Sequence, residues 1–134
     1  MSVTEPEHDF GEDVVISGEK LRGFTADETV EQHDIVQITG DYEVSLAGDG
    51  EHALGAASFD RADGQEVSVA ADDCEVRVIS GEAITAGNAV TPNGSGAVRE
   101  AADGDVKLGI ALTSAGDDEV VHVYLTNAEG AEVA

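Results

Sequence analysis

The sequence predicts an all-β fold: two tandem small modules, each β-barrel or β-clip-like, that arose by internal duplication and follow an extended N-terminal arm. Three observations predict it. The stretch 28–73 aligns with 82–127 without a gap, at an offset of 54 residues (28 to 82). Apolar and polar residues alternate over short segments, as in half-buried strands. Glycine and aspartate turns separate these segments, and no long stretch shows helical periodicity.

The two copies share more than chance matches of Ala and Val would give. Identical residues fill 13 of the 46 aligned positions and include paired Asp-Gly turns and paired Leu-Gly-x-Ala runs. Two copies are too few for an open repeat array, so we expect them to share one core. A shorter echo, 15–19 against 78–82, indicates nine extra residues in the first copy. The identical pairs are Glu28/Glu82, Val36/Val90, Gly40/Gly94, Val44/Val98, Ala47/Ala101, Asp49/Asp103, Gly50/Gly104, Leu54/Leu108, Gly55/Gly109, Ala57/Ala111, Asp63/Asp117, Val67/Val121 and Val69/Val123.

The chain divides into four parts by its pattern. Residues 1–13 are acidic and aperiodic and contain Pro6, which indicates an extended arm. The β pattern then predicts a first module over 14–77 and a second module over 78–127, with a short C-terminal tail over 128–134.

Each module has the same order of predicted elements. A strand, a tight turn and a second strand lead to an Asp-Gly turn; a Leu-Gly-x-Ala strand, another turn and a Val-x-Val strand follow. Gly55 and Gly109 lie inside strand patterns, which predicts a bulge or a close approach of two backbones. Thr25 and Glu28 have the spacing of a helix cap, so one short helical turn is possible there.

The composition indicates adaptation to salt. The formal net charge is −23, from 29 acidic and six basic residues. Such self-repulsion destabilises a compact state unless salt screens it, and at about 1 M salt the Debye length falls to about 3 Å. We therefore expect a virus of a haloarchaeon as the source. The alternative, an acidic disordered protein, is disfavoured because the acids alternate with apolar residues. Nucleic acid is not an expected partner, because no basic stripe is present.

The residues that carry chemistry form no catalytic or transition-metal motif. The four histidines are far apart in sequence, and the single Cys74 lies in phase with strand valines, as a buried thiol does. Acidic turns leave calcium open as an alternative, although no segment matches an EF-hand loop. No signal peptide or membrane-spanning run is apparent. We expect no enzymatic activity and no cofactor.

The second copy resembles the small β domains of capsid (head) decoration, or cement, proteins of tailed viruses, related to the lambda-type head decoration proteins. Four segments carry the resemblance in order: an I-x-A-G-x-x-V strand and turn at 84–90, a G-x-V hairpin at 96–98, G-I-A-L at 109–112 and V-x-V-x-L at 121–125. The first copy keeps a weaker version. The resemblance implies a module on the outer capsid surface, commonly a homotrimer, that binds the major capsid protein and stabilises the shell.

This resemblance sets the functional expectation: a structural virion protein, made in the host cytoplasm, with no membrane or nucleic-acid partner. The alternatives are a virion turret or vertex accessory protein and a cellular halophilic β-barrel binding module. The expected contact residues, on the capsid or on a neighbouring subunit, are the apolar residues of the arm and its junction: Val3, Phe10, Val14, Val15 and Ile16.

Overall fold

The computed structural model describes residues 14–127, and within this range the secondary structure consists of strands without any helix. The all-β prediction is therefore confirmed. The strands are β1 (Val15–Ser17), β2 (Lys20–Ala26), β3 (Ile35–Gly40), β4 (Glu43–Leu46), β5 (Gly55–Ala57), β6 (Glu66–Ala70), β7 (Glu75–Ile79), β8 (Ala89–Pro92), β9 (Val98–Glu100), β10 (Gly109–Ala111) and β11 (Val120–Leu125).

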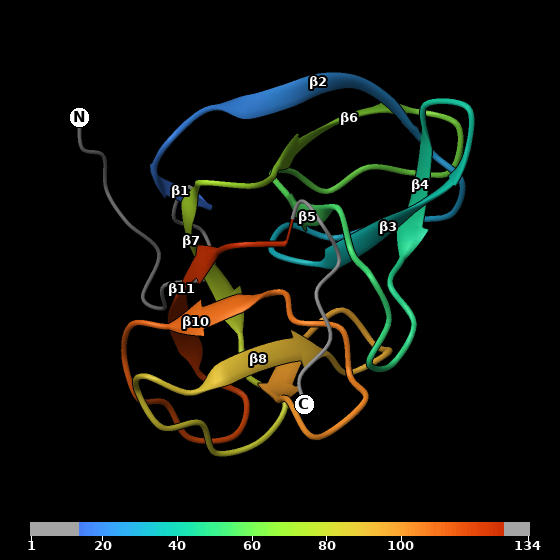
Figure 1. Ribbon diagram of the computed structural model, residues 1–134. Coiled ribbons are helices and arrows are strands. Elements are labelled where there is room, and N and C mark those ends of the chain that lie inside the picture. The colour runs from blue at the N-terminus through green and yellow to red at the C-terminus, as the bar shows by residue number, and fades with distance from the viewer. Residues whose placement is uncertain (1–13, 128–134) are drawn as a thin grey trace.

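The strands form two sheets that lie one above the other in Figure 1. One sheet is a closed barrel with the strand order β2-β4-β3-β5-β6. The other has six strands in the order β1-β7-β11-β10-β8-β9. Neighbouring strands are antiparallel in both sheets, except that β2 and β4 run parallel. Among the antiparallel pairs, β3 with β4 and β8 with β9 are joined by short hairpins, as the Gly and Asp turn signals predict.

The two halves of the described chain have the same backbone pairing. β3, β4, β5 and β6 correspond to β8, β9, β10 and β11 at the offset of 54 residues. Their ladders also keep the same register, so the prediction that Val36 and Val90 occupy equivalent strands is confirmed. Matching cross-strand pairs are Val36/Gly55 with Val90/Gly109, Ala57/Val69 with Ala111/Val123, and Ile38/Val44 with Pro92/Val98.

The nine-residue insertion predicted from the short echo is wrong. Phe24 of β2 pairs with Val67, and Val78 of β7 pairs with Val121, so β2 and β7 are equivalent at the same offset of 54. The stretch taken as an insertion is strand β2 itself, and no helical turn forms at Thr25. The sequence pattern did not reveal strand β2, because the register of its pairing with β6 shifts between Leu21 and Phe24. Such irregularities break the alternation that marks a strand.

Strand β1 lies outside this repeat. Val15 pairs with Val76, which places β1 beside β7 at the edge of the second sheet, although β1 precedes the barrel in the chain. The described part of the chain therefore starts in the second sheet, builds the barrel and then returns to the second sheet through β7 (Figure 1).

The two halves differ in how their ends close. In the barrel, β2 and β4 form a parallel ladder that includes Ala26 and Val44. The equivalent contact in the second half is a single parallel bridge between Ser80 and Val98. The first half is thus a closed barrel. The second half follows the same path, but a single bridge replaces the ladder that closes the barrel, so its sheet is open.

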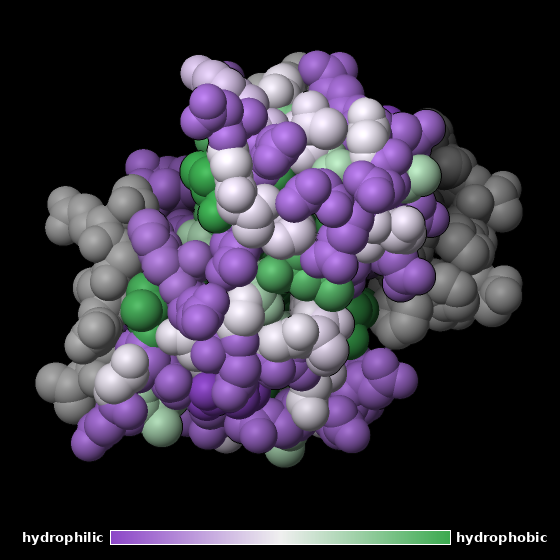
Figure 2. Space-filling model, turned by 90° about the vertical axis from the view of Figure 1, so that its right-hand side faces the viewer, coloured by the Kyte–Doolittle hydropathy of each residue, from purple (hydrophilic) through white to green (hydrophobic). Residues whose placement is uncertain are grey.

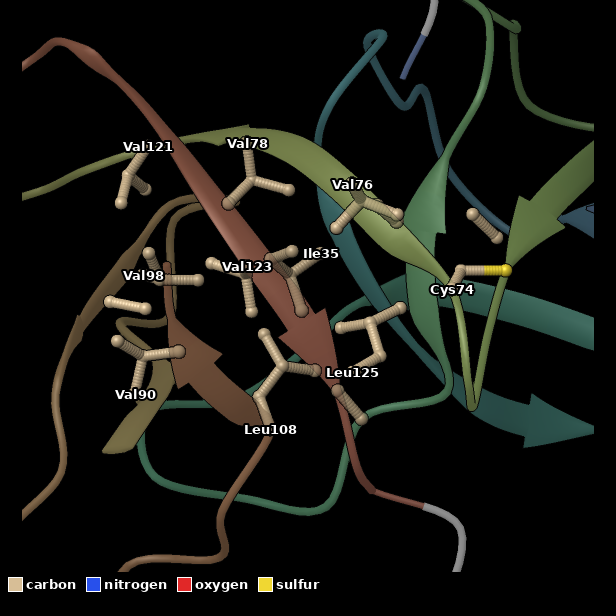
Figure 3. Packing of buried hydrophobic residues seen from close by; sticks show 14 of the residues in the cluster. Ile35, Cys74, Val76, Val78, Val90, Val98, Leu108, Val121, Val123 and Leu125 are labelled. Atoms are coloured by element: carbon tan, nitrogen blue, oxygen red, sulfur yellow. The ribbon is translucent and has the colours of Figure 1, made fainter. Parts of the chain in front are cut away.

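Buried side chains form two clusters rather than the single shared core that we expected. The smaller cluster fills the barrel and contains Phe24, Val36 and Val67. The larger cluster joins the halves: Ile35 of β3 lies among valines and leucines of the second sheet (Figure 3). Full burial of each such side chain stabilises the fold by about 1.5–3 kcal/mol. The halves therefore share one of their two clusters.

Gly55 and Gly109 are equivalent and allow neighbouring backbones to approach closely, as predicted. A Cβ atom on Gly55 would overlap the carbonyl oxygen of Ala70, and one on Gly109 would overlap that of Tyr124. Only glycine leaves room for these contacts, which explains why both copies retain it within a strand.

Candidate interaction surfaces

The predicted arm contacts fall partly outside the described residues. Val3 and Phe10 lie outside them. Val14 is fully buried in the cluster shared by the two halves, and Val15 packs against that cluster from β1. Ile16 is half-buried on the same strand. The side chain of Val14 thus packs within the protein, so the remaining contact predictions depend on Val3, Phe10, Val15 and Ile16.

The paired Asp-Gly turns come together at Arg99 of β9. Arg99 donates from Nε to Asp49 Oδ1 at 2.8 Å and from Nη1 to Asp105 Oδ2 at 2.8 Å. The hydrogen bonds from Asp105 and Asp49 raise the pKa of Arg99, and the same contact lowers the pKa of Asp105. The Val106 N–H also donates to the Gly50 carbonyl at 2.9 Å. These turns therefore form a joint between the halves.

An open acidic cleft of about 850 Å³ is lined by residues of both halves. Within it, Asp34 Oδ2 accepts a hydrogen bond from the Glu31 N–H at 2.8 Å. Burial raises the pKa of Asp34 to about 6. Nearby, Nδ1 of the buried His33 lies 2.7 Å from the Arg77 carbonyl oxygen. The carboxylates that line the cleft are those of Glu31, Asp34, Asp60, Asp117 and Asp118.

These carboxylates do not converge as metal ligands must. Among residues 14–127, no group of three or more His, Cys, Asp or Glu side chains is placed to hold a metal ion. Cys74 is buried, as predicted, and its Sγ lies 3.0 Å from the Glu19 carbonyl oxygen. A buried thiol of this kind packs as a small apolar residue.

A smaller pocket of about 410 Å³ is mainly apolar. Leu21 and Ile38 stand at it with 46% and 57% of their surfaces exposed, and Leu54 contributes a half-buried side chain. Asn127 also lines the pocket and is buried; its Nδ2 donates to the Leu54 carbonyl at 3.0 Å, and its Oδ1 has no partner.

Two basic side chains lie over an exposed aromatic ring on the barrel. Phe59 follows β5 and is 43% exposed. Lys20 Nζ lies 4.9 Å from the ring centroid, and Arg61 Cζ lies 5.1 Å from it. Both distances are within the range of cation–π attraction. We call these three residues the Phe59 platform.

The face of the molecule shown in Figure 2 is largely hydrophilic, with small separate apolar patches.

Sequence reasoning missed the Phe59 platform and the role of Arg99. Lys20 is distant in sequence from Phe59 and Arg61, so no local motif marks the whole platform. A signal was nevertheless present: basic residues are so rare in this chain that each one invites an explanation. For Arg99, the signal was the pair of Asp-Gly turns, which the repeat had already singled out.

Comparisons with known proteins agree with this architecture. No curated protein matches the chain. A solved structure, the head fiber gp8.5 N base of bacteriophage phi29, is similar with a TM-score of 0.69 and 19% sequence identity, over 87% of this chain and 99% of that one. At this identity the likeness shows a shared fold. Among residues 14–127 no helix is long and apolar enough to cross a membrane.

The family comparison spans both halves. The model of the phage cement protein family matches residues 16–125, from β1 to the end of β11. The match therefore includes the barrel, the second sheet and the joint between them. The chain belongs to the phage cement protein family and is a structural, capsid-associated component of the virion.

Proposed function

We propose that this protein decorates the outer surface of an icosahedral capsid and stabilises the shell by binding the major capsid protein. The family match over residues 16–125 is the observation that carries the proposal. The two halves support it physically, because a shared apolar cluster and the Arg99 joint make one body that can bridge neighbouring subunits. The protein acts as a homotrimer on the shell and assembles in the host cytoplasm.

The N-terminal arm supplies part of the attachment. Val3 and Phe10 are apolar residues in an otherwise acidic segment, and burying such side chains against a neighbouring subunit contributes about 1.5–3 kcal/mol each before ordering costs. Co-sedimentation with undecorated capsids in high salt tests this. We expect a chain lacking residues 1–13 to fold but to bind more weakly than full-length protein. A chain lacking 128–134 is the matched control.

The outcomes separate the arm from the function. Equal binding of the arm-deleted and full-length chains would remove the arm as an anchor and leave the contact to the strands and turns. Failure of full-length protein to bind any capsid of its own virus would overturn the proposal.

A second candidate is the base of a head fibre or another vertex structure. The similarity to the phi29 head fiber base, which covers 99% of that chain, favours it. The two roles differ in stoichiometry, because a cement protein covers the whole shell and a vertex protein only selected positions. Quantifying the chain against the major capsid protein in purified particles distinguishes them.

The acidic surface adapts the protein to a salt-rich environment, as in a haloarchaeal virus. Net charge of −23 opposes the compact state, and this repulsion is largely screened at about 1 M salt. Thermal melts from low to molar KCl should therefore show rising stability. A melting temperature that is flat or falls with salt would contradict this adaptation.

A further inference from the structure

The smaller, apolar pocket lies at one end of the barrel, where β2 and β5 begin and β3 and β6 end. We call it the barrel mouth. Its volume of about 410 Å³ is large enough to hold a side chain, and barrel mouths are common places for binding sites. We define the barrel mouth by five of the residues that line it: Leu21, Ile38, His52, Leu54 and Ala71.

The equivalent end of the second half is closed. Two fully buried leucines, Leu108 and Leu125, stand there at the positions of Leu54 and Ala71. The barrel half supplies the cover, because two alanines of its loop between β4 and β5 are buried in the same cluster as these leucines. The second half therefore shows how a mouth of this kind is filled: a loop from a neighbouring module lies on it.

Two backbone hydrogen bonds hold that loop in place. The Gly50 N–H donates to the Pro92 carbonyl oxygen, and the Val106 N–H donates to the Gly50 carbonyl oxygen, each at 2.9 Å. At the offset of 54, the second-half acceptor corresponds to Ile38 and the second-half donor to His52, and both line the barrel mouth. Within the described part of the chain, the His52 N–H makes no hydrogen bond. The barrel mouth thus repeats the positions that receive a peptide backbone in the second half, and its His52 N–H is available to a partner.

The barrel mouth also offers apolar surface to a side chain. Leu21 is 46% exposed, at a position where the second half has Glu75, and Ile38 is 57% exposed. The small Ala71 leaves space at a position where the second half has Leu125. An apolar group that covers these side chains removes them from water, which favours binding. Backbone hydrogen bonds combined with a side-chain pocket are the means by which β proteins bind extended peptides.

Charge distinguishes between the occupants of such a site. Asp72 also lines the barrel mouth and is exposed, and the whole chain carries a formal net charge of −23. The terminal segments 1–13 and 128–134 are acidic, so these segments or a second copy would bring like charges together. A neutral or basic segment of another protein is the complement of this site. For a structural component of the virion, the capsid supplies that protein.

We propose that the barrel mouth binds an extended, neutral or basic segment of the major capsid protein. The segment places a large apolar side chain between Leu21, Ile38 and Leu54, and one of its carbonyl oxygens accepts a hydrogen bond from the His52 N–H. This inference rests on the proposed function, and it adds the surface that makes the contact and the kind of peptide that the surface recognises.

Co-sedimentation of full-length variants with undecorated capsids in high salt tests the proposal. Leu21→Glu and Ala71→Leu each install the residue of the second half; the first puts a carboxylate into the barrel mouth, and the second fills it. Each should weaken binding about tenfold or more, as loss of a central contact does. Leu112→Glu is the matched control, because Leu112 is 45% exposed, undergoes the same change of charge and does not line the barrel mouth. Thermal melts show whether each variant folds.

A photoreactive residue identifies the occupant and does not depend on those variants. Full-length protein with p-benzoylphenylalanine in place of the exposed Ile38 is bound to capsids and irradiated, and mass spectrometry identifies the cross-linked peptides. We expect cross-links to the major capsid protein. Cross-links confined to residues 1–13 or 128–134 of the same chain, or to a second copy, would overturn the proposal.

The outcomes for the barrel mouth and for the proposed function are distinct. If the folded Leu21→Glu and Ala71→Leu variants bind capsids as tightly as the unchanged protein, the barrel mouth is not the contact and the proposed function stands. If the unchanged protein binds no capsid of its own virus, the proposed function fails and this inference fails with it. If either variant does not fold, the cross-link at position 38 decides.

Discussion

The barrel and the second sheet follow the same backbone path, but equivalent side chains are buried to different extents in the two halves. Leu54 of the barrel half is half-buried, and its equivalent Leu108 is 1% exposed at the centre of the shared cluster. The backbone N–H of each leucine donates an equivalent hydrogen bond. Leu54 donates to the Val36 carbonyl and Leu108 to the Val90 carbonyl, both at 2.8 Å. The hydrogen-bond pattern thus fixes the path, whereas the packing of the halves on each other decides which equivalent residues become core.

The same comparison holds at the closure of each half. The buried Ala26 lies in the parallel ladder of the barrel, and its equivalent is Ser80, also buried. The hydroxyl of Ser80 hydrogen-bonds to the backbone carbonyl oxygens of Gly116 and Glu119. A side-chain hydroxyl thus holds the nearby turn in the second half, whereas the barrel closes through a longer backbone ladder.

Truncation of the equivalent residues Leu54 and Leu108 should give the largest difference in stability between the two halves. Leu108→Ala should destabilise the protein by about 2–5 kcal/mol, because it leaves a cavity in a packed core. Leu54→Ala should cost clearly less, since part of that side chain is already in water. Denaturant unfolding of both variants gives the two free energies. Equal losses would mean that the halves do not differ in packing at these positions.

Removing the joint between the halves should have the next largest effect. Arg99→Ser introduces the residue found at the equivalent position, Ser45. It removes a charge-assisted hydrogen bond to the largely buried Asp105, of a kind worth about 1.5–3 kcal/mol, and one to the exposed Asp49, which contributes about 1 kcal/mol at most. Lys107→Ser removes the same charge and serves as the control in urea unfolding. If both variants lose equal stability, the effect is one of net charge and not of the joint.

Asp34→Asn should have the smallest effect and the opposite sign. It introduces the residue of the second half, Asn88, in place of a carboxyl whose pKa burial raises to about 6 from 3.8. A raised pKa means that the folded state favours the protonated acid, so the unmodified chain gains stability as the pH falls from 6 towards 4. The variant should be more stable at pH 7, by about 1 kcal/mol after allowing for solvent screening.

The pH dependence is the decisive part of that prediction. The advantage of the variant should shrink as the pH falls through 6 and should vanish near pH 4, which thermal melts across this range would show. An advantage that does not change with pH would mean that the Asp34 carboxyl is not the cause.

The sequence was informative over the 46 aligned residues of the two copies, whereas the shorter echo of 15–19 in 78–82 led to a wrong insertion. Val67 and Val121, an identical pair of the repeat, are both buried as equivalent core positions, whereas of the identical pair Leu54 and Leu108 only Leu108 is fully buried. Gly55 was predicted as a close backbone approach, which the structure shows. The edge position of β1 was not predictable from pattern, because it depends on a long-range pairing of Val15 with Val76. The Phe59 platform was not predictable for the same reason, because Lys20 reaches the Phe59 ring only when β2 pairs with β6.

The central claim is that this protein stabilises a capsid by binding to its outer surface. The most direct measurement is the temperature at which undecorated capsids release their contents, with and without saturating full-length protein in high salt. The account predicts that the release temperature rises with occupancy and reaches a plateau when the sites are filled. Saturated binding with an unchanged release temperature would contradict it.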